Sequence, residues 1–176
     1  MFHQGDAMSL PFSEDTFDVA VMALVIFYVP YPRKGVAEMA RVVCPGGWVA
    51  TYAWDMMGGG FPHEPMQAEM RTMGLKTVVQ PNADASRIEV LQQLWSDAGF
   101  EAIDTRVIIV QRSFDNFDDY WAITLLSPTV GATIATMTPR DIDVLKARMR
   151  TRLVADPAGR ITYTARANAI KGRVPY

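Results

Sequence analysis

Side chains that could bind or activate a ligand stand where predicted strands end. Asp6 follows a strand tail at His3, while Tyr28, Trp54 and Asp55 lie at or just beyond the ends of two later strands. In open α/β sheets, ligands bind outside the carboxyl ends of the strands. An aromatic face at Tyr28 or Trp54 would attract a cation by about 0.5–2 kcal/mol, with core packing as the alternative for Trp54. Asp55 is a candidate general base or has a helix-capping or turn role. Asp6 either binds a ligand or closes an Asx-turn.

Other residues of chemical interest do not form recognisable sites. Cys44 is the single cysteine and has no His or Asp close to it in sequence, so we expect a packed thiol in a protein of the reducing cytoplasm. His63 and Glu64 have no partners at the spacing of metal ligands, and we predict no metal site. The glycines at 58–60 lack the strand, Lys and Ser/Thr of a phosphate loop, and they indicate a hinge.

Two strands joined by a helix would position the candidate residues. Residues 17–27 are apolar on both faces, which is typical of a parallel strand covered by helices on both sides. An apolar stripe predicts a helix over 32–43, ended by Pro-Gly-Gly at 45–47, and residues 48–54 form the next strand. The stripe consists of Val36, Met39, Ala40 and Val43. Strand, helix and strand over this length make one βαβ unit.

The second half of the chain also alternates helices and strands. A capping box at Ser86 and Glu89 predicts a helix start, and Gly99 predicts its end, with Phe100 folded back on Trp95. The remaining predicted elements are a strand over 102–111, a short helix marked by Phe117, Tyr120 and Trp121, a helix from Thr138 to about Val154, and a last strand over 160–170. We expect a sheet that is parallel in its first half and ends in an antiparallel pair.

Three stretches resemble the class I S-adenosylmethionine-dependent methyltransferases of the small-molecule kind, in the style of the quinone-biosynthesis C-methyltransferases. They are GDAMSLPF at 5–12, FDVAV at 17–21 and EMARVVCPGG at 38–47. Their order matches the family's third strand, fourth strand, following helix and fifth strand, and AGFE at 98–101 resembles the entry to its sixth strand. The resemblance implies an α/β fold with a Rossmann-like methyltransferase sheet, parallel at first and ending in an antiparallel C-terminal pair.

The resemblance also implies a cofactor, S-adenosylmethionine, and residues that bind it. The family position of Asp6 accepts a hydrogen bond from the adenine amino group, and the backbone N–H at Ala7 donates to a ring nitrogen. Ala23 matches the position whose backbone contacts the methionine part, and Leu24 is its neighbour. The implied activity is methyl transfer to a small-molecule acceptor. Orientation of the reactants can supply most of that catalysis, so no catalytic residue is predicted.

The first two strands of the family's sheet have no counterpart in this sequence. The glycine-rich turn that cradles the methionine end goes with them, since no Gly-x-Gly follows a strand here. We therefore expect this chain alone to bind the cofactor weakly or not at all and to have little activity. Residues 17–27 would form an open edge, through which a homo-oligomer could assemble. The alternative function is a non-catalytic methyltransferase remnant that acts as an interaction module or needs a partner chain.

We expect one domain over 1–176, with a cofactor-side core over 1–55 and substrate-side segments over 56–85 and 113–137. The aromatic stripe in the last segment would either roof an apolar pocket or pack as ordinary helix core. The predicted substrate-binding residues are Tyr28, Trp54, Asp55, Tyr120 and Trp121.

The charge distribution is uneven although the net charge is only −2. Residues 139–176 carry nine Lys and Arg against three Asp and Glu, which leaves the first 138 residues at −8 and this segment at +6. Most charge runs are solvated faces, so we expect no nucleic-acid or membrane partner. The longest apolar run, over 19–29, is about half of the roughly 20 residues that a membrane helix needs.

Overall fold

The computed structural model describes residues 2–176 and divides the chain into two compact units. Unit 1 contains residues up to Gly60, Gln80–Ile108 and Arg166–Tyr176, and unit 2 contains Phe61–Val79 and Ile109–Ala165. Strands β3 (Glu101–Phe114) and β4 (Ile161–Arg173) each have residues in both units. Within the described range, no helix is both long enough and apolar enough to cross a membrane.

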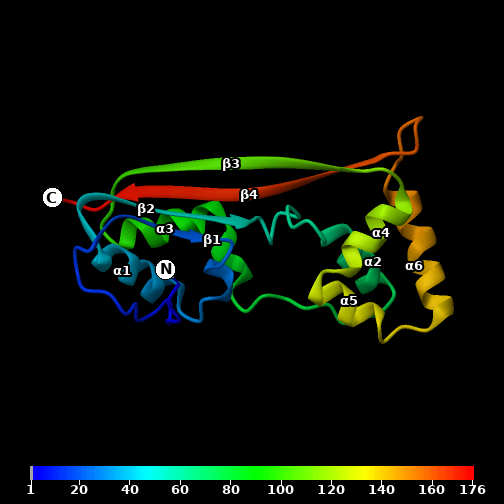
Figure 1. Cartoon of the computed structure of the whole chain (residues 1–176), viewed down its shortest axis with the longest axis horizontal. Coiled ribbons are helices and arrows are strands. Elements are labelled where there is room, and N and C mark those ends of the chain that lie inside the picture. The colour runs from blue at the N-terminus through cyan, green and yellow to red at the C-terminus, as the bar shows by residue number, and fades with distance from the viewer. Residues whose placement is uncertain (1) are drawn as a thin grey trace. The chain divides into compact units, whose positions relative to one another are not determined.

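A mixed sheet organises unit 1. It has the order β1-β2-β4-β3, where β1 is Phe17–Ala23 and β2 is Val43–Trp54 (Figure 1). β1 and β2 pair in parallel, and β2 and β4 pair antiparallel. The predicted change from parallel to antiparallel pairing is therefore confirmed.

The helices of unit 1 lie on one face of this sheet. α1 (Pro32–Val42), which lies below the strands in Figure 1, and α3 (Ile88–Asp97) contact each other, and their apolar faces pack on the buried residues of β2. Val19 and Val21 on β1 remain 53% and 58% exposed. The expectation that helices cover this strand on both sides is wrong for the described residues, because β1 is an edge strand with one uncovered face.

The Pro-Gly-Gly sequence at 45–47 lies inside β2 and does not separate the helix from the strand. α1 ends at Val42 and β2 begins at Val43, with an irregularity of the β1–β2 register between Phe17 and Val19. Gly46 has φ +80, and a Cβ there would lie 2.8 Å from the Tyr176 ring. The predicted helix and strand are confirmed, but their boundary is shifted, because two glycines in a strand permit a bulge.

The two ends of α3 differ in how well the sequence predicted them. Ser86 lies in a short 3-10 helix (Ala83–Ser86), where its hydroxyl donates to Ala83 O at 2.6 Å and accepts from Met56 N at 3.1 Å. The capping-box prediction is therefore wrong, since the hydroxyl is used in tertiary contacts and Arg87 precedes the helix. The predicted C-terminal end is confirmed: Gly99 has φ +77, and Phe100 N donates to Trp95 O.

Unit 2 is mainly helical and has its own core. Its helices are α2 (Glu64–Thr72), α4 (Phe117–Leu125), α5 (Pro128–Ile134) and α6 (Pro139–Arg152). The sequence predicted α4 and α6, including the Thr138 cap, which accepts from Asp141 N at 3.2 Å, and it missed α2 and α5. The largest fully buried side chains of this core are Met66, Met70, Leu145, Met149 and Ile161.

The basic residues of α6 are largely paired within unit 2. Arg148 and Arg152 both contact the carboxylate of Glu69, at 3.8 and 3.1 Å. Arg150 pairs with Asp118 at 3.3 Å and lies over the Phe117 ring. Part of the positive charge of the C-terminal segment is therefore paired with acidic side chains inside unit 2.

Candidate cofactor site

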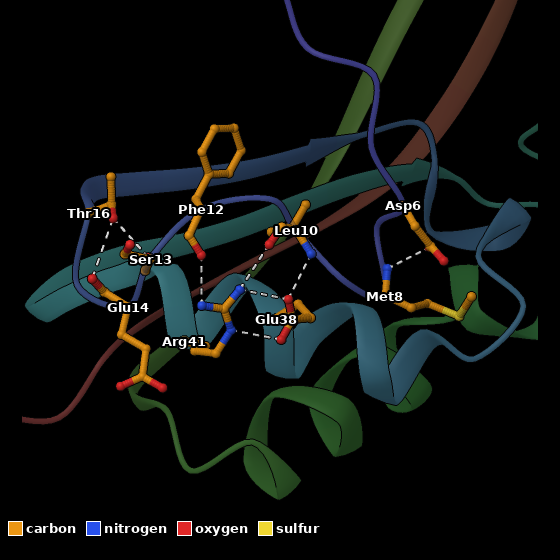
Figure 2. A network of polar contacts seen from close by, with 9 residues as sticks. All are labelled: Asp6, Met8, Leu10, Phe12, Ser13, Glu14, Thr16, Glu38 and Arg41. Carbon is orange, nitrogen blue, oxygen red and sulfur yellow. Dashed lines mark hydrogen bonds and ion pairs between the residues drawn. The ribbon is translucent and has the colours of Figure 1, made fainter.

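A tight loop after residue 5 places Asp6 and Ala7 beside the carboxyl end of β1. Asp6 Oδ1 accepts from Met8 N at 2.8 Å, and Ser9 N donates to Asp6 O at 3.0 Å (Figure 2). Asp6 therefore closes the Asx-turn that was one of its two interpretations. The side chain is exposed, and in residues 2–176 its Oδ2 has no hydrogen-bond partner, so one carboxylate oxygen can still accept from a ligand.

A cavity of about 260 Å³ brings two of the predicted cofactor residues together. Ala7 from the loop and Ala23 from the end of β1 both line it. Its other lining residues are Leu10, Ala20, Val21, Met22, Val25 and Met39. The lining is apolar, and Asp6 precedes the lining residue Ala7 in the chain without lining the cavity itself. Ligand pockets combine apolar walls with a few polar groups, so such a cavity can take an apolar ring.

Side chains of α1 hold the loop through its backbone. Glu38 Oε2 accepts from Leu10 N at 2.7 Å, and the Arg41 guanidinium donates to the carbonyl oxygens of Leu10 and Phe12 at 3.1 and 2.9 Å (Figure 2). Arg41 also forms a two-point contact with Glu38, Nε to Oε1 and Nη2 to Oε2, each 2.8 Å. The hydrogen bond from Arg41, together with the one from Leu10 N, lowers the pKa of Glu38 to about 2, against the opposing effect of desolvation.

The backbone changes direction abruptly just after β1. Leu24 has φ +56, a region that non-glycine residues rarely occupy, and its N–H donates to Tyr52 O at 2.8 Å. Such conformations concentrate at functional sites. Leu24 does not line the cavity, so its predicted contact with the cofactor stays a prediction. Tyr28 follows in a short 3-10 helix (Ile26–Tyr28), and its side chain is exposed.

Trp54 and Asp55 at the end of β2 have structural partners. Trp54 is half-buried against the core of unit 1. Asp55 is only 7% exposed, and its Oδ2 accepts two hydrogen bonds from Arg166, at 2.9 and 2.5 Å. Its Oδ1 accepts from Gly58 N at 2.8 Å. This arrangement matches the turn-closing interpretation of Asp55, because both oxygens already hold the 55–60 turn in place.

Tyr120 and Trp121 belong to the core of unit 2. They are 3% and 8% exposed and pack with buried residues of the surrounding helices. Burial raises the pKa of Tyr120 to about 12, so the phenol stays protonated at neutral pH. The aromatic stripe therefore packs as ordinary helix core, and substrate binding by Tyr120 and Trp121 stays a prediction.

The two histidines lie apart from the cavity lining. His63 precedes α2 in unit 2 and contacts the Phe61 ring edge-on, and burial lowers its pKa. His3 is exposed near Phe12. Over residues 2–176, no cluster of three His, Cys, Asp or Glu side chains could hold a metal ion.

Sequence reasoning missed the residues that hold and complete the cavity. Leu10, Val25 and Met39 line it, and Glu38 and Arg41 fix its loop. The signal for the last two was present, because Glu and Arg three residues apart share one face of a helix. Their use against backbone atoms 28–31 residues away could not be read from that spacing.

Sequence comparisons match parts of this chain to methyltransferases. Residues 1–51 match the family model described as a methyltransferase domain. The demethylmenaquinone methyltransferase of Desulfitobacterium hafniense (strain Y51) is 50% identical over 48 residues, which are 27% of this chain and 19% of that protein. The one from Clavibacter sepedonicus is 28% identical over 118 residues, 60% of this chain and 48% of that protein. The matched parts thus span less than half of each relative.

Solved structures share the fold of nearly the whole chain. A structure described as a putative methyltransferase from Bacillus halodurans superposes with a TM-score of 0.57 and 16% identity, over 99% of this chain and 78% of that one. The YcgJ protein of Bacillus subtilis gives 0.57 and 18%, over 99% and 71%. Residues 1–51 are thus similar to a methyltransferase domain, and nearly the whole chain has the fold of these two solved structures.

Proposed function

We propose that this chain contributes to methyl transfer from S-adenosylmethionine to a small-molecule acceptor. The observation that carries the proposal is the cavity that Ala7, the residue after Asp6, shares with Ala23, within the residues that match the methyltransferase family model. The cofactor would supply a methyl carbon already activated by its sulfonium. The chain's own residues would bind and orient the adenine end, and orientation is the main catalytic need of such a displacement.

The residues at the cavity fit that group. The Asp6 carboxylate would accept from the adenine amino group through the oxygen that the turn does not use, and the two alanines allow a ring to approach the backbone closely. The family match favours this function over a non-catalytic interaction module. Two sequenced relatives act, by name, on demethylmenaquinone, which supports an acceptor of the small-molecule class.

Two further expectations stay proposals. The first is that the family's first two strands lie outside these residues, which the edge position of β1 in the described sheet supports. The second is assembly of copies through that edge, supported by the exposed Val19 and Val21.

Removal of the Asp6 carboxylate tests the proposed function. Asp6→Ala should weaken binding of S-adenosylhomocysteine by about 1.5–3 kcal/mol, the range for a hydrogen bond to a charged group. Asp6→Asn should have a smaller effect, because the amide oxygen still accepts. Ligand-observed NMR titration, which measures weak binding, gives the dissociation constants.

Asp18→Ala is the matched control, since Asp18 is an exposed carboxylate on β1 that does not line the cavity. It should leave the affinity unchanged. Equal affinities for wild type and Asp6→Ala, with folding intact, would leave Asp6 as a turn residue only and would remove the main support for the proposal.

A further inference from the structure

We propose that Glu38 and Arg41 are positioning residues for the cofactor: together they hold the 5–12 loop so that Ala7 and Leu10 line the cavity. This inference rests on the proposed function, because it gives the loop a ligand to present. Neither side chain lines the cavity itself. They act through the backbone that they hold, from a helix that lies under the loop (Figure 2).

The pair satisfies both backbone polar groups of one residue. Leu10 N–H donates to Glu38, and Leu10 C=O accepts from Arg41, at 2.7 and 3.1 Å. Arg41 reaches Phe12 O as well, at 2.9 Å. A loop lacks the regular backbone hydrogen bonds of a helix or sheet. Side chains that bond to its backbone N–H and C=O groups therefore fix its path. The segment between the Asp6 turn and Phe12 is thereby held at both ends.

This geometry needs a guanidinium. Arg41 uses Nε and Nη2 toward Glu38, Nη2 again toward Leu10 O, and Nη1 toward Phe12 O. A planar fork presents these donors in fixed directions, whereas a lysine ammonium is a single compact charge. An ion pair with Glu38 alone would not need an arginine, because a lysine at position 41 could also pair with a carboxylate one helical turn away.

Residues of the loop and of the helix that holds it both line the cavity. Leu10 lines the cavity, and so does Met39, the buried neighbour of Glu38 in α1. Glu38 and Arg41 are themselves mostly shielded, with side chains 18% and 29% exposed. A shift of the Leu10 backbone away from α1 would therefore change the wall that faces Ala23.

The test compares Arg41→Lys with Arg87→Lys. Arg87 also pairs with an acidic residue three positions away, Asp84, but has no contact with the loop. Amide hydrogen exchange of residues 6–12 and the dissociation constant of S-adenosylhomocysteine are measured for wild type and both variants, with thermal unfolding as a check on folding. Arg41→Lys should speed exchange at Leu10 and weaken ligand binding, each about tenfold or more, as loss of hydrogen bonds to a charged group predicts. Arg87→Lys should change neither.

Three outcomes would decide against the inference or its basis. Exchange in the loop that is the same for both variants would overturn it. Faster exchange with unchanged ligand affinity would also overturn it, since the pair would then stabilise the loop without positioning a ligand. Absence of binding by the wild-type chain would contradict the proposed function and the positioning role with it, while loop exchange would still show whether the pair holds the loop. If Arg41→Lys does not fold, Glu38→Asp, whose shorter carboxylate withdraws from Leu10 N, is judged by the same two measurements.

Discussion

Asp55 illustrates how a carboxylate at the end of a strand can be used for structure. A carboxylate in such a place is a candidate base because strand ends face ligands. Here both of its oxygens are occupied, by Arg166 and by the Gly58 N–H. The same turn has no room for a side chain at Gly58, where a Cβ would lie 2.2 Å from the Asp55 carboxylate. Whether a carboxylate can act as a base therefore depends on the hydrogen-bond partners that the fold brings to it.

Asp55→Asn should lower the free energy of unfolding by about 1–3 kcal/mol, because the amide donates where Arg166 needs an acceptor and the site is buried. Asp104→Asn is the matched control, since Asp104 is exposed and lies 3.8 Å from Lys171, so its loss should cost less than about 1 kcal/mol. Urea unfolding measures both. If Asp55→Asn were as stable as wild type, the structural role would be wrong and the general-base interpretation would regain support.

At the junction of the 5–12 loop with α1, three hydrogen bonds join side chains of the helix to the loop backbone. The helix follows from its apolar stripe and from Pro32 at its first position. Its outer face carries the pair that holds the loop, and its inner face buries Val36 and Met39. One helix thus supports both the core and the wall of the cavity.

Glu38 should make stability depend on pH in the acid range. Its pKa is lowered to about 2 in the folded chain by the hydrogen bonds from Arg41 and Leu10, against an ordinary value of 4.5. The ionised form therefore stabilises the fold fully above about pH 4.5, and this contribution is lost as the pH falls toward 2. Glu38→Gln should be less stable than wild type by about 1.5–3 kcal/mol at pH 7, and the difference should shrink below pH 4.5.

Urea unfolding between pH 7 and pH 3 measures this dependence. Glu89→Gln is the control, because Glu89 is exposed and lies 3.7 Å from Arg87, and its effect should be small at every pH. A difference between wild type and Glu38→Gln that stays constant with pH would show that the ionised carboxylate does not stabilise the loop.

Element types could be predicted from the sequence wherever local rules decide them. The stripe of α1, the Gly99 ending of α3 and the Thr138 cap of α6 depend on neighbours within a few residues, and all three are confirmed. The prediction failed where distant contacts compete. The Ser86 hydroxyl is taken by Met56 N, 30 residues away. α5 was missed because its short sequence, PTVGATI, has weak helix formers and is held by burial of Val130 and Ile134.

The whole chain builds two separate cores. Unit 1 holds the matched motifs, the sheet and the cavity, and unit 2 buries its own apolar set around Met66 and Leu145. Ala7 and Ala23 were foreseen as cofactor residues and do share a cavity. Tyr120 and Trp121 were foreseen as substrate residues, yet they complete the second core. The periodicity of apolar residues locates the apolar face of a helix. It does not show whether that face packs against the protein core or against a ligand.

We propose that the cavity lined by Ala7 and Ala23 binds the adenine end of the cofactor. Amide-resolved NMR titration of the wild-type chain with S-adenosylhomocysteine tests it most directly. We expect saturable shifts at Ala7, Leu10, Ala23 and Met39, with one dissociation constant in the weak range, and no comparable shifts at the surface groove of unit 2 that includes Leu75 and Pro128. Shifts absent from the cavity residues at saturating ligand, or confined to the unit 2 groove, would contradict the account.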